Sequence, residues 1–341
     1  MPLRLAMLGL WHTHADGMVR QVCAHPDEFQ LVGFHDPSPT VVAQRARQWE
    51  SLVPGFRVFE TAADLLRQPL DGVLVEGRVH LNLGFARQAL ERGLPVLLEK
   101  PAGIRFAEFE SVAQLAQSRG LRLQLAYLFR YMSAVQELLA RHRRGDLGQV
   151  YLFRGRLPKD LALYKQLVVE LGEYEGGVFF EMAGHLVDLA VALAGRPRHV
   201  TSVLRHHHGT GPADYIDNGI ALIEFDRALA EIDITGLEVA PASRRIEVFG
   251  TGGAVVIPHL GSGHLENGAV QPLEVCRAGD ATWTRLSPPA VALQIADLRE
   301  FAAVLGGRKQ PDFPLEHDLM VHETLLAASR MDRPGAGTRP A

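Results

Sequence analysis

Apolar residues in the first third of the chain gather in short runs of strand length, and the segments between them have helical periodicity. The strand-like runs cover residues 3–8, 29–36, 72–75, 95–100 and 121–127. After the first run, Ala15, Met18, Val19 and Val22 fall on one helical face. Because each run is too apolar to face water and the runs alternate with helices, the pattern predicts a parallel sheet covered on both faces. We therefore expect a doubly wound α/β domain over residues 1–125.

Local start and stop signals support this alternation. Ser38 and Pro39 form an N-cap and first-turn pair for a helix that runs through Trp49. Thr61 and Asp64 form a capping box for another short helix. A helical run after the third strand ends at residue 93, a glycine, and a further amphipathic helix separates the fourth and fifth strands.

Beyond Tyr127 the pattern changes from regular alternation to a series of strands with a few helices. Helical periodicity covers 132–145, 175–195, 291–305 and 315–331, and strand-like segments cover 150–156, 201–207, 218–225, 228–234, 244–250 and 254–257. This order predicts an α+β domain over residues 126–331, built on a large, open and mostly antiparallel sheet. The last ten residues, 332–341, read as a loose tail.

Composition excludes several classes of partner. The 341 residues include 35 Lys and Arg against 39 Asp and Glu, for a formal net charge of −4, and the basic residues are dispersed. Such a chain lacks the clustered positive field that a nucleic acid or an anionic membrane requires, so we expect a small-molecule partner. Cys23 and Cys276 cannot form a disulfide framework, and we find no signal peptide or membrane span, which predicts a cytoplasmic protein.

Several stretches, in order and spacing, resemble the Gfo/Idh/MocA family of nicotinamide-dependent sugar and polyol oxidoreductases. They are "LDGVLVEGRVHLNLGFARQALERGLPVLLEKPAG", "AYLFRYMSAV", "GDLGQVYLFRGR", "GGVFFEMAGHLVDLAVALAGRP" and "RRIEVFGTGGAVV". The most specific pieces are Glu99-Lys100-Pro101 after a strand, and a helical acid, Glu181, followed four residues later by His185. The resemblance covers nearly the whole chain and implies an N-terminal Rossmann domain followed by a substrate-binding and oligomerisation domain.

The turn after the first strand departs from the usual dinucleotide-binding pattern. Gly9 stands at the first glycine position of GxGxxG, but Trp11 and His14 replace the other two. Anion attraction in such a turn comes from backbone N–H groups and the helix dipole, which need no glycine. We therefore expect the loop residues to bind the cofactor, namely Gly9, Leu10, Trp11 and His12.

Two further segments complete the predicted cofactor site. Asp36 ends the second strand, where a carboxylate accepts both adenosine ribose hydroxyls and repels a 2′-phosphate, so NAD is favoured over NADP. After the third strand the chain departs from the family pattern, but Gly77 and His80 are still expected to contact the cofactor. Nearby Glu76 is expected to meet a ribose or to pair with Arg78, and a plain surface loop remains an equal alternative for Arg78 and His80. The resemblance assigns Glu99 to the nicotinamide ribose.

The resemblance also implies the catalytic residues, which are Lys100, His185 and Glu181. Lys100 would contact the reacting oxygen, and His185 would exchange a proton with it. Glu181, His185 and Asp188 fall at i, i+4 and i+7, on a stripe opposite the apolar side of their helix. The family usually has Asp at the position of Glu181, so the substrate is displaced to match or the role of the acid has changed.

Residues near the predicted domain junction form the candidate substrate site. Besides Asp188 they are Tyr127, Arg130, Arg156 and Lys159, whose cations suit an anionic or hydroxyl-rich ligand. No metal site is predicted, because the histidine run at 206–208 lacks the spaced acid or cysteine ligands of a defined site.

The sequence leaves three functions open. The first is an NAD-linked dehydrogenase or reductase acting on a sugar, polyol or related hydroxy compound. The second is a non-catalytic protein that senses NAD or a sugar on the same fold, and the third is a lyase or glycosidase that oxidises its substrate transiently. Retention of both Lys100 and His185 favours the enzymes. An open sheet face further predicts a homodimer or homotetramer formed through that face.

Overall fold

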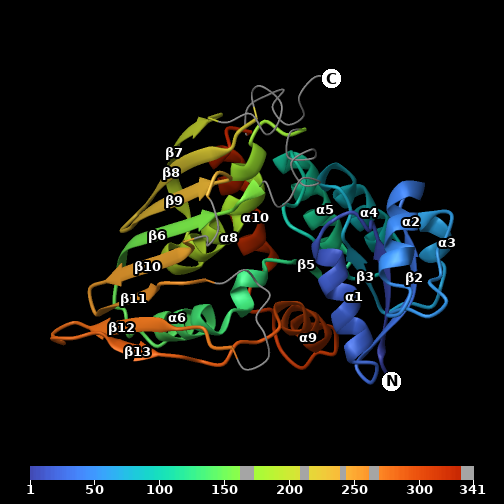
Figure 1. Cartoon of the computed structure of the whole chain (residues 1–341), viewed down its shortest axis with the longest axis horizontal. Helices are drawn as coiled ribbons and strands as arrows, with labels where there is room; N and C mark the ends of the chain where they lie inside the picture. Colours follow the sequence, from blue (N-terminus) through green and yellow to red (C-terminus); the bar gives the residue numbers. More distant parts are fainter. Residues whose placement is uncertain (162–172, 208–214, 239–242, 261–268, 332–341) are drawn as a thin grey trace. The chain divides into compact units, whose positions relative to one another are not determined.

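The computed structural model describes residues 1–161, 173–207, 215–238, 243–260 and 269–331 (Figure 1). The chain divides into two compact units. The first contains residues 1–126 and 294–319, and the second contains 127–293 and everything after residue 319. The first division falls beside the predicted boundary at 125, but residues 294–319 belong to the first unit, whereas the sequence analysis assigned them to the second. The predicted tail, 332–341, lies outside the described residues.

A five-stranded parallel sheet forms the centre of the first unit, in the order β2-β1-β3-β4-β5. Its strands are β1 (Leu3–Leu8), β2 (Phe29–His35), β3 (Gly72–Val75), β4 (Val96–Leu98) and β5 (Leu123–Leu125). Every residue of the three last strands is buried, which is why their sequences are apolar throughout. Strand β2 lies on one side of β1, and the chain then crosses back so that β3 lies on the other side. This reversal is a topological switch point, the place where open parallel sheets bind ligands.

Five helices of the first unit follow the predicted pattern closely, and a sixth was predicted for the second domain. They are α1 (His14–Ala24), α2 (Pro39–Gln48), α3 (Ala62–Leu65), α4 (Val79–Glu91), α5 (Phe106–Ser118) and α9 (Leu293–Leu305). Helix α1 buries the four residues predicted for its inner face. The Ser38 hydroxyl accepts a hydrogen bond from the Val41 N–H, which confirms the predicted N-cap of α2. Helix α4 packs beside α5, and Gly17 of α1 meets the side chain of Gln294 in α9.

The second unit is built on an eight-stranded sheet in the order β13-β12-β11-β10-β6-β9-β8-β7 (Figure 1). The strands are β6 (Val150–Pro158), β7 (Pro197–Arg205), β8 (Asn218–Phe225), β9 (Leu229–Thr235), β10 (Arg245–Gly250), β11 (Gly253–Ile257), β12 (Leu273–Arg277) and β13 (Thr284–Leu286). Neighbouring strands are antiparallel except for β6 and β9, which are parallel. The mostly antiparallel sheet was predicted, but β12 and β13 were not.

One long helix covers one face of this sheet. The helices of the unit are η1 (Leu128–Tyr131), α6 (Ser133–Arg143), α8 (Gly177–Ala194) and α10 (Leu315–Ala328), which begins before the boundary at residue 319. Leu186 of α8 fills the space where Gly155 of β6 has no side chain. Helix α8 is long and apolar enough to cross a membrane by length and composition, and nearly all of it is buried, as in a core helix.

The opposite face of the sheet carries exposed apolar side chains. In β8 the residues alternate strictly, so that Ile220 and Leu222 are 46% and 54% exposed while their neighbours are buried. Val203 of β7 lies opposite Ile220 in the register, and Leu229 of β9 is also exposed. This face therefore has the apolar character that the sequence analysis associated with subunit contacts.

Candidate functional site

The loop after β1 is tied to both sides of the switch point. The N–H of Gly9 donates to the His35 carbonyl at 2.8 Å, and the N–H of His12 donates to the Glu76 carbonyl at 2.9 Å. Gly9 has φ +76°, and a Cβ there would lie 2.3 Å from the Cα of Gly77. The first glycine is thus required both by its backbone angle and by the close crossing of the two loops.

A buried arginine that the sequence analysis missed holds the same loop from α2. The Arg45 side chain donates to the carbonyls of Leu10 and His12, each at 2.7 Å. Its position carries a signal, because Val42, Arg45 and Trp49 share one helical face and Trp49 is a core residue. Arg45 therefore fixes the shape of a loop in which two glycines are missing.

Asp36 lies where the sequence placed it, at the end of β2, and also supports the loop. One carboxylate oxygen accepts the N–H of Leu10 at 2.7 Å, and the other accepts the N–H of Ser38 at 2.8 Å. A carboxylate has about four lone-pair sites, so both oxygens can accept further hydrogen bonds from a ligand.

A cavity of about 330 Å³ opens beside Asp36. It is lined by Trp11, Asp36, Pro37, Ser38, Val41, Arg78, His80 and Leu81. The Arg78 guanidinium lies over the Trp11 ring, with its carbon 5.4 Å from the ring centroid. The structure thus brings together three of the predicted cofactor residues, Trp11, Asp36 and His80, and adds Arg78 to them.

Two buried carboxylates and two imidazoles meet where β1, β3 and β4 end. Glu76 follows β3 directly and Glu99 follows β4, and each is only 1% exposed. His14 Nδ1 lies 3.0 Å from Glu99 Oε2, and His12 Nδ1 lies 3.8 Å from Glu99 Oε1 and 3.9 Å from Glu76 Oε2. We call these four residues the switch-point cluster. Glu76 faces His12 here, and Arg78 lies over Trp11.

The pKa values of the two carboxyl groups in the switch-point cluster are shifted in opposite directions. Burial raises the pKa of Glu76 well above its usual value, and the nearby charge of Glu99 raises it further. Burial also opposes ionisation of Glu99, but the imidazoles of His14 and His12 outweigh it and lower the pKa of Glu99 to about 2. The surroundings of the cluster therefore favour the ionised form of Glu99 and the protonated form of Glu76.

Lys100 lies next to this cluster. Its side chain is 2% exposed, and its Nζ is 3.9 Å from Glu99 Oε1. The peptide bond between Lys100 and Pro101 is cis. Lys100 is thus a buried cation at the carboxyl edge of the sheet, as the sequence predicted.

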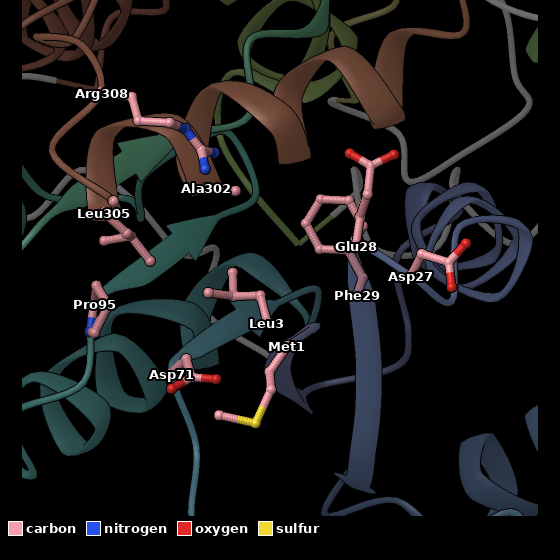
Figure 2. A pocket seen from close by; sticks show the side chains of 11 residues that line it. Met1, Leu3, Asp27, Glu28, Phe29, Asp71, Pro95, Ala302, Leu305 and Arg308 are labelled. Atoms are coloured by element: carbon pink, nitrogen blue, oxygen red, sulfur yellow. The ribbon is translucent and has the colours of Figure 1, made fainter.

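A second hollow, of about 580 Å³, lies at the opposite edge of the same sheet (Figure 2). It is lined by residues that precede or begin strands and by the end of α9, namely Met1, Leu3, Asp27, Glu28, Phe29, Asp71, Pro95, Ala302, Leu305, Gly306 and Arg308. Ligands of parallel sheets bind at the carboxyl ends of the strands, and three acidic residues against one arginine disfavour phosphate groups. This hollow is therefore not the dinucleotide site.

In the second unit, the polar stripe of α8 meets the segment 127–131. The His185 ring stacks on Phe129 with centroids 4.2 Å apart and planes 11° apart, and the Tyr127 ring meets its edge at 6.0 Å. Glu181 and His185 are each 5% exposed. The stripe is therefore buried like the rest of the helix, and aromatic contacts fix the plane of the imidazole.

Arg130 and Asp188, both predicted to bind substrate, form a buried ion pair with each other. Arg130 Nε lies 3.1 and 3.0 Å from the two Asp188 oxygens, and a terminal nitrogen lies 2.6 Å from Oδ1. Arg130 is 1% exposed and Asp188 is 0% exposed. Each charge therefore satisfies the other inside the unit, as in a structural pair.

Arg156 lies on the face of the large sheet that α8 does not cover. Successive residues of a strand point to opposite faces, and Gly155 faces α8, so Arg156 points to the other face of the sheet. There it pairs with Asp233 at 2.9 Å and with Glu238 at 2.7 Å. Substrate binding by Arg156 stays a prediction. Lys159, just after β6, is half-buried, and its N–H donates to the Thr235 carbonyl.

Comparison with known protein families assigns both units. Residues 3–127 match the oxidoreductase family profile with an NAD-binding Rossmann fold, and residues 135–256 match the Gfo/Idh/MocA C-terminal domain. The chain belongs to the Gfo/Idh/MocA family. By family it is an NAD-binding oxidoreductase, and the matched ranges follow the two-domain order predicted from the sequence.

Individual relatives of this Gfo/Idh/MocA protein are distant. The rhizopine catabolism protein MocA of Rhizobium meliloti is 32% identical over 99 residues, which cover 29% of this chain and 31% of the relative. An uncharacterised oxidoreductase of Schizosaccharomyces pombe is 23% identical over 63% of this chain and 58% of its own length. The alignments therefore span about a third to somewhat more than half of these relatives.

Solved structures resemble the whole chain. An oxidoreductase from Agrobacterium radiobacter, in complex with NAD+, L-tartaric acid and magnesium, has a TM-score of 0.80 at 16% identity and covers 99% of this chain and 98% of its own. The WlbA dehydrogenase from Bordetella pertussis, in complex with NADH and UDP-GlcNAcA, has a TM-score of 0.77 at 19% identity, with 100% and 99% covered. At these identities the likeness shows the shared fold.

Proposed function

We propose that this Gfo/Idh/MocA protein is an NAD-dependent dehydrogenase or reductase that acts on a secondary alcohol or carbonyl group of a sugar, polyol or related hydroxy compound. The observation that carries the proposal is the cavity beside Asp36 at the switch point, with Gly9, Gly77 and buried Lys100 at the same edge of the sheet. Structural neighbours crystallised with tartaric acid and with a nucleotide sugar support a hydroxylated substrate.

The residues beside this cavity fit an adenosine group. The adenine would lie against Trp11 and Arg78, whose stacked side chains form one wall of the cavity. Asp36 would accept hydrogen bonds from both ribose hydroxyls and would repel a 2′-phosphate. Bound NAD supplies the acceptor for the hydride that leaves the alcohol carbon.

Lys100 and His185 would have different roles in the reaction, because an ammonium group donates hydrogen bonds and a neutral imidazole accepts a proton. When hydride leaves a secondary alcohol, the hydroxyl proton must leave too, and a neutral imidazole such as His185 accepts it. The protonated Lys100 amine orients the reacting oxygen and stabilises negative charge that develops on it. Glu181, one helical turn before His185, holds the imidazole or a substrate hydroxyl.

A binding experiment tests the cofactor part of the proposal. We expect calorimetry to show tighter binding of NAD than of NADP, and we expect Asp36→Ala to lose that preference. Trp11 fluorescence should change on binding, and Trp11→Phe should remove the change while the other two tryptophans remain. Equal affinities for the two cofactors would refute the role of Asp36, and no binding of either would refute a dehydrogenase.

Turnover tests the catalytic part, on a substrate found by screening sugars and polyols with NAD. We expect His185→Ala and Lys100→Ala each to lower kcat by about 100-fold or more with NAD affinity little changed. Glu181→Asp should have a milder effect. Wild-type rates in both alanine variants would contradict these assignments.

Two broader features are part of the proposal. The exposed apolar face of the large sheet suits a homodimer or homotetramer. Unpaired Cys23 and Cys276 suit a cytoplasmic location.

A further inference from the structure

The switch-point cluster contains nitrogen and oxygen ligands at separations that suit a metal ion. One ligand atom each from His12, His14 and Glu99 lie within 4.8 Å of one another. Around a tetrahedral ion with bonds of about 2.0–2.1 Å, ligand atoms are about 3.3–3.4 Å apart. His14 Nδ1 lies 3.0 Å from Glu99 Oε2, and His12 Nδ1 lies 3.8 Å from Glu99 Oε1, so the two distances lie on either side of that value. Small side-chain rotations would therefore bring these three residues into coordination.

Unsatisfied buried oxygens give an independent sign of a missing ligand. Within the described part of the chain, Glu76 Oε2 and Glu99 Oε1 are buried and accept no hydrogen bond. Both lie within 4 Å of His12 Nδ1, so both face the centre of the cluster. A buried carboxylate oxygen without a partner is costly, and a bound ion is one of the few ways to satisfy it.

We propose that His12, His14 and Glu99, with Glu76 as a fourth ligand, bind one divalent transition-metal ion of the Zn²⁺ class. Two imidazoles and two carboxylates form a mixed nitrogen and oxygen set that suits Zn²⁺ better than Mg²⁺ or Ca²⁺, which prefer oxygen ligands. Because a ligand must be deprotonated, the ion would displace the proton that Glu76 favours, and the two carboxylates would then balance its double charge.

Two contacts oppose metal binding and limit its strength. The Lys100 amine, 3.9 Å from Glu99 Oε1, repels a cation in the cluster. The His14 N–H donates to His12 Nδ1 at 3.2 Å, a long hydrogen bond that the ion would replace. The bound ion would in return tie the loop after β1, in which two glycines are missing, to the ends of β3 and β4.

Metal binding is measured on the untagged full chain without NAD, so the result is separate from the proposed dehydrogenase activity. The protein is stripped with a chelator and equilibrated with Zn²⁺ or Co²⁺, and bound metal is counted by mass spectrometry. We expect about one equivalent per chain, visible Co²⁺ absorption bands of a four-coordinate site, and no displacement by excess Mg²⁺. Less than about a tenth of an equivalent would overturn the proposal.

Variants locate the ion. We expect His14→Ala and Glu99→Gln each to weaken Zn²⁺ binding by about tenfold or more. His25→Ala is the matched control, because His25 lies at the far end of α1 and contacts the Gln21 carbonyl. His206→Ala tests the histidine run in the second unit. Circular dichroism checks folding, and if Glu99→Gln does not fold, the partly exposed His14→Ala decides. Unchanged binding in His14→Ala, or loss in His206→Ala, would overturn the assignment.

Discussion

Replacing Asp188 by alanine is expected to destabilise the second unit strongly. The change leaves the Arg130 guanidinium, 1% exposed, without the carboxylate that it contacts at 2.6–3.1 Å. Removing one partner of a buried ion pair costs about 3–5 kcal/mol. A typical domain has only about 5–15 kcal/mol of unfolding free energy, so this loss is a large share of the total.

The cost of leaving one charge unpaired can be measured separately from the stabilisation that the ion pair itself provides. A double variant, Arg130→Met with Asp188→Leu, removes both charges and should recover at least about 2 kcal/mol of the loss, because buried pairs are often no more stabilising than apolar replacements. Glu231→Ala is the control. It breaks the contact of Glu231 with Arg154 at 3.5 Å, in which both side chains are about half exposed, and should cost less than about 1 kcal/mol.

Urea unfolding followed by fluorescence and by circular dichroism measures these differences, and coincidence of the two probes shows whether a single transition is observed. A loss below about 1 kcal/mol in Asp188→Ala, together with a raised KM, would refute the reasoning. It would support instead the substrate-binding role that the sequence suggested for Asp188.

Three further outcomes follow from other residues. Burial lowers the pKa of His322 from its usual 6.5 to about 3, so the unfolded state binds more protons than the folded state below pH 6.5. The free energy of unfolding should therefore fall as the pH drops below 6.5, by about 2 kcal/mol at pH 5. Urea titrations at several pH values should show this loss, and His322→Gln should lack it. Gly9→Ala should abolish NAD binding in calorimetry and lower the unfolding temperature, because a Cβ there meets the Gly77 backbone; wild-type affinity would contradict the tight crossing. Leu222→Asp, on the exposed sheet face, should yield a smaller species in sedimentation than wild type if that face joins subunits, and identical sedimentation of an oligomer would exclude it.

The sequence predicted elements whose signals are local. Helix α1 buries the four residues expected from helical periodicity, and Ser38 caps α2 as its position indicated. Strand β13 escaped prediction because it has no buried residue to create an alternating pattern, whereas β12 does alternate and was overlooked. Local pattern also could not show which sheet α9 covers, since an amphipathic helix reads the same on either.

The same distinction, between features of one segment and features that depend on several, applies to the candidate site residues. The end of β2 placed Asp36 correctly, because strand ends can be read from one segment. The meeting of His12 and His14 with Glu76 and Glu99 depends on three strands ending at one edge, which requires the strand order. The partners of Arg156 depend likewise on its pairing across β6 and β9, which no single segment contains.

The return of residues 294–319 to the first unit has a consequence for synthesis on the ribosome. Phe301 of α9 packs where Gly72 of β3 has no side chain, and the Gln124 side-chain amide of β5 donates to Asp297 Oδ1 at 2.8 Å in the buried interior. The first sheet therefore cannot bury its surface when residue 126 emerges. At about 5–20 residues per second, it waits on the order of ten seconds or more while the second unit is made. During that interval the nascent chain exposes a partly covered parallel sheet, so the first unit cannot complete its folding until residues 294–319, made long after its own strands, have emerged.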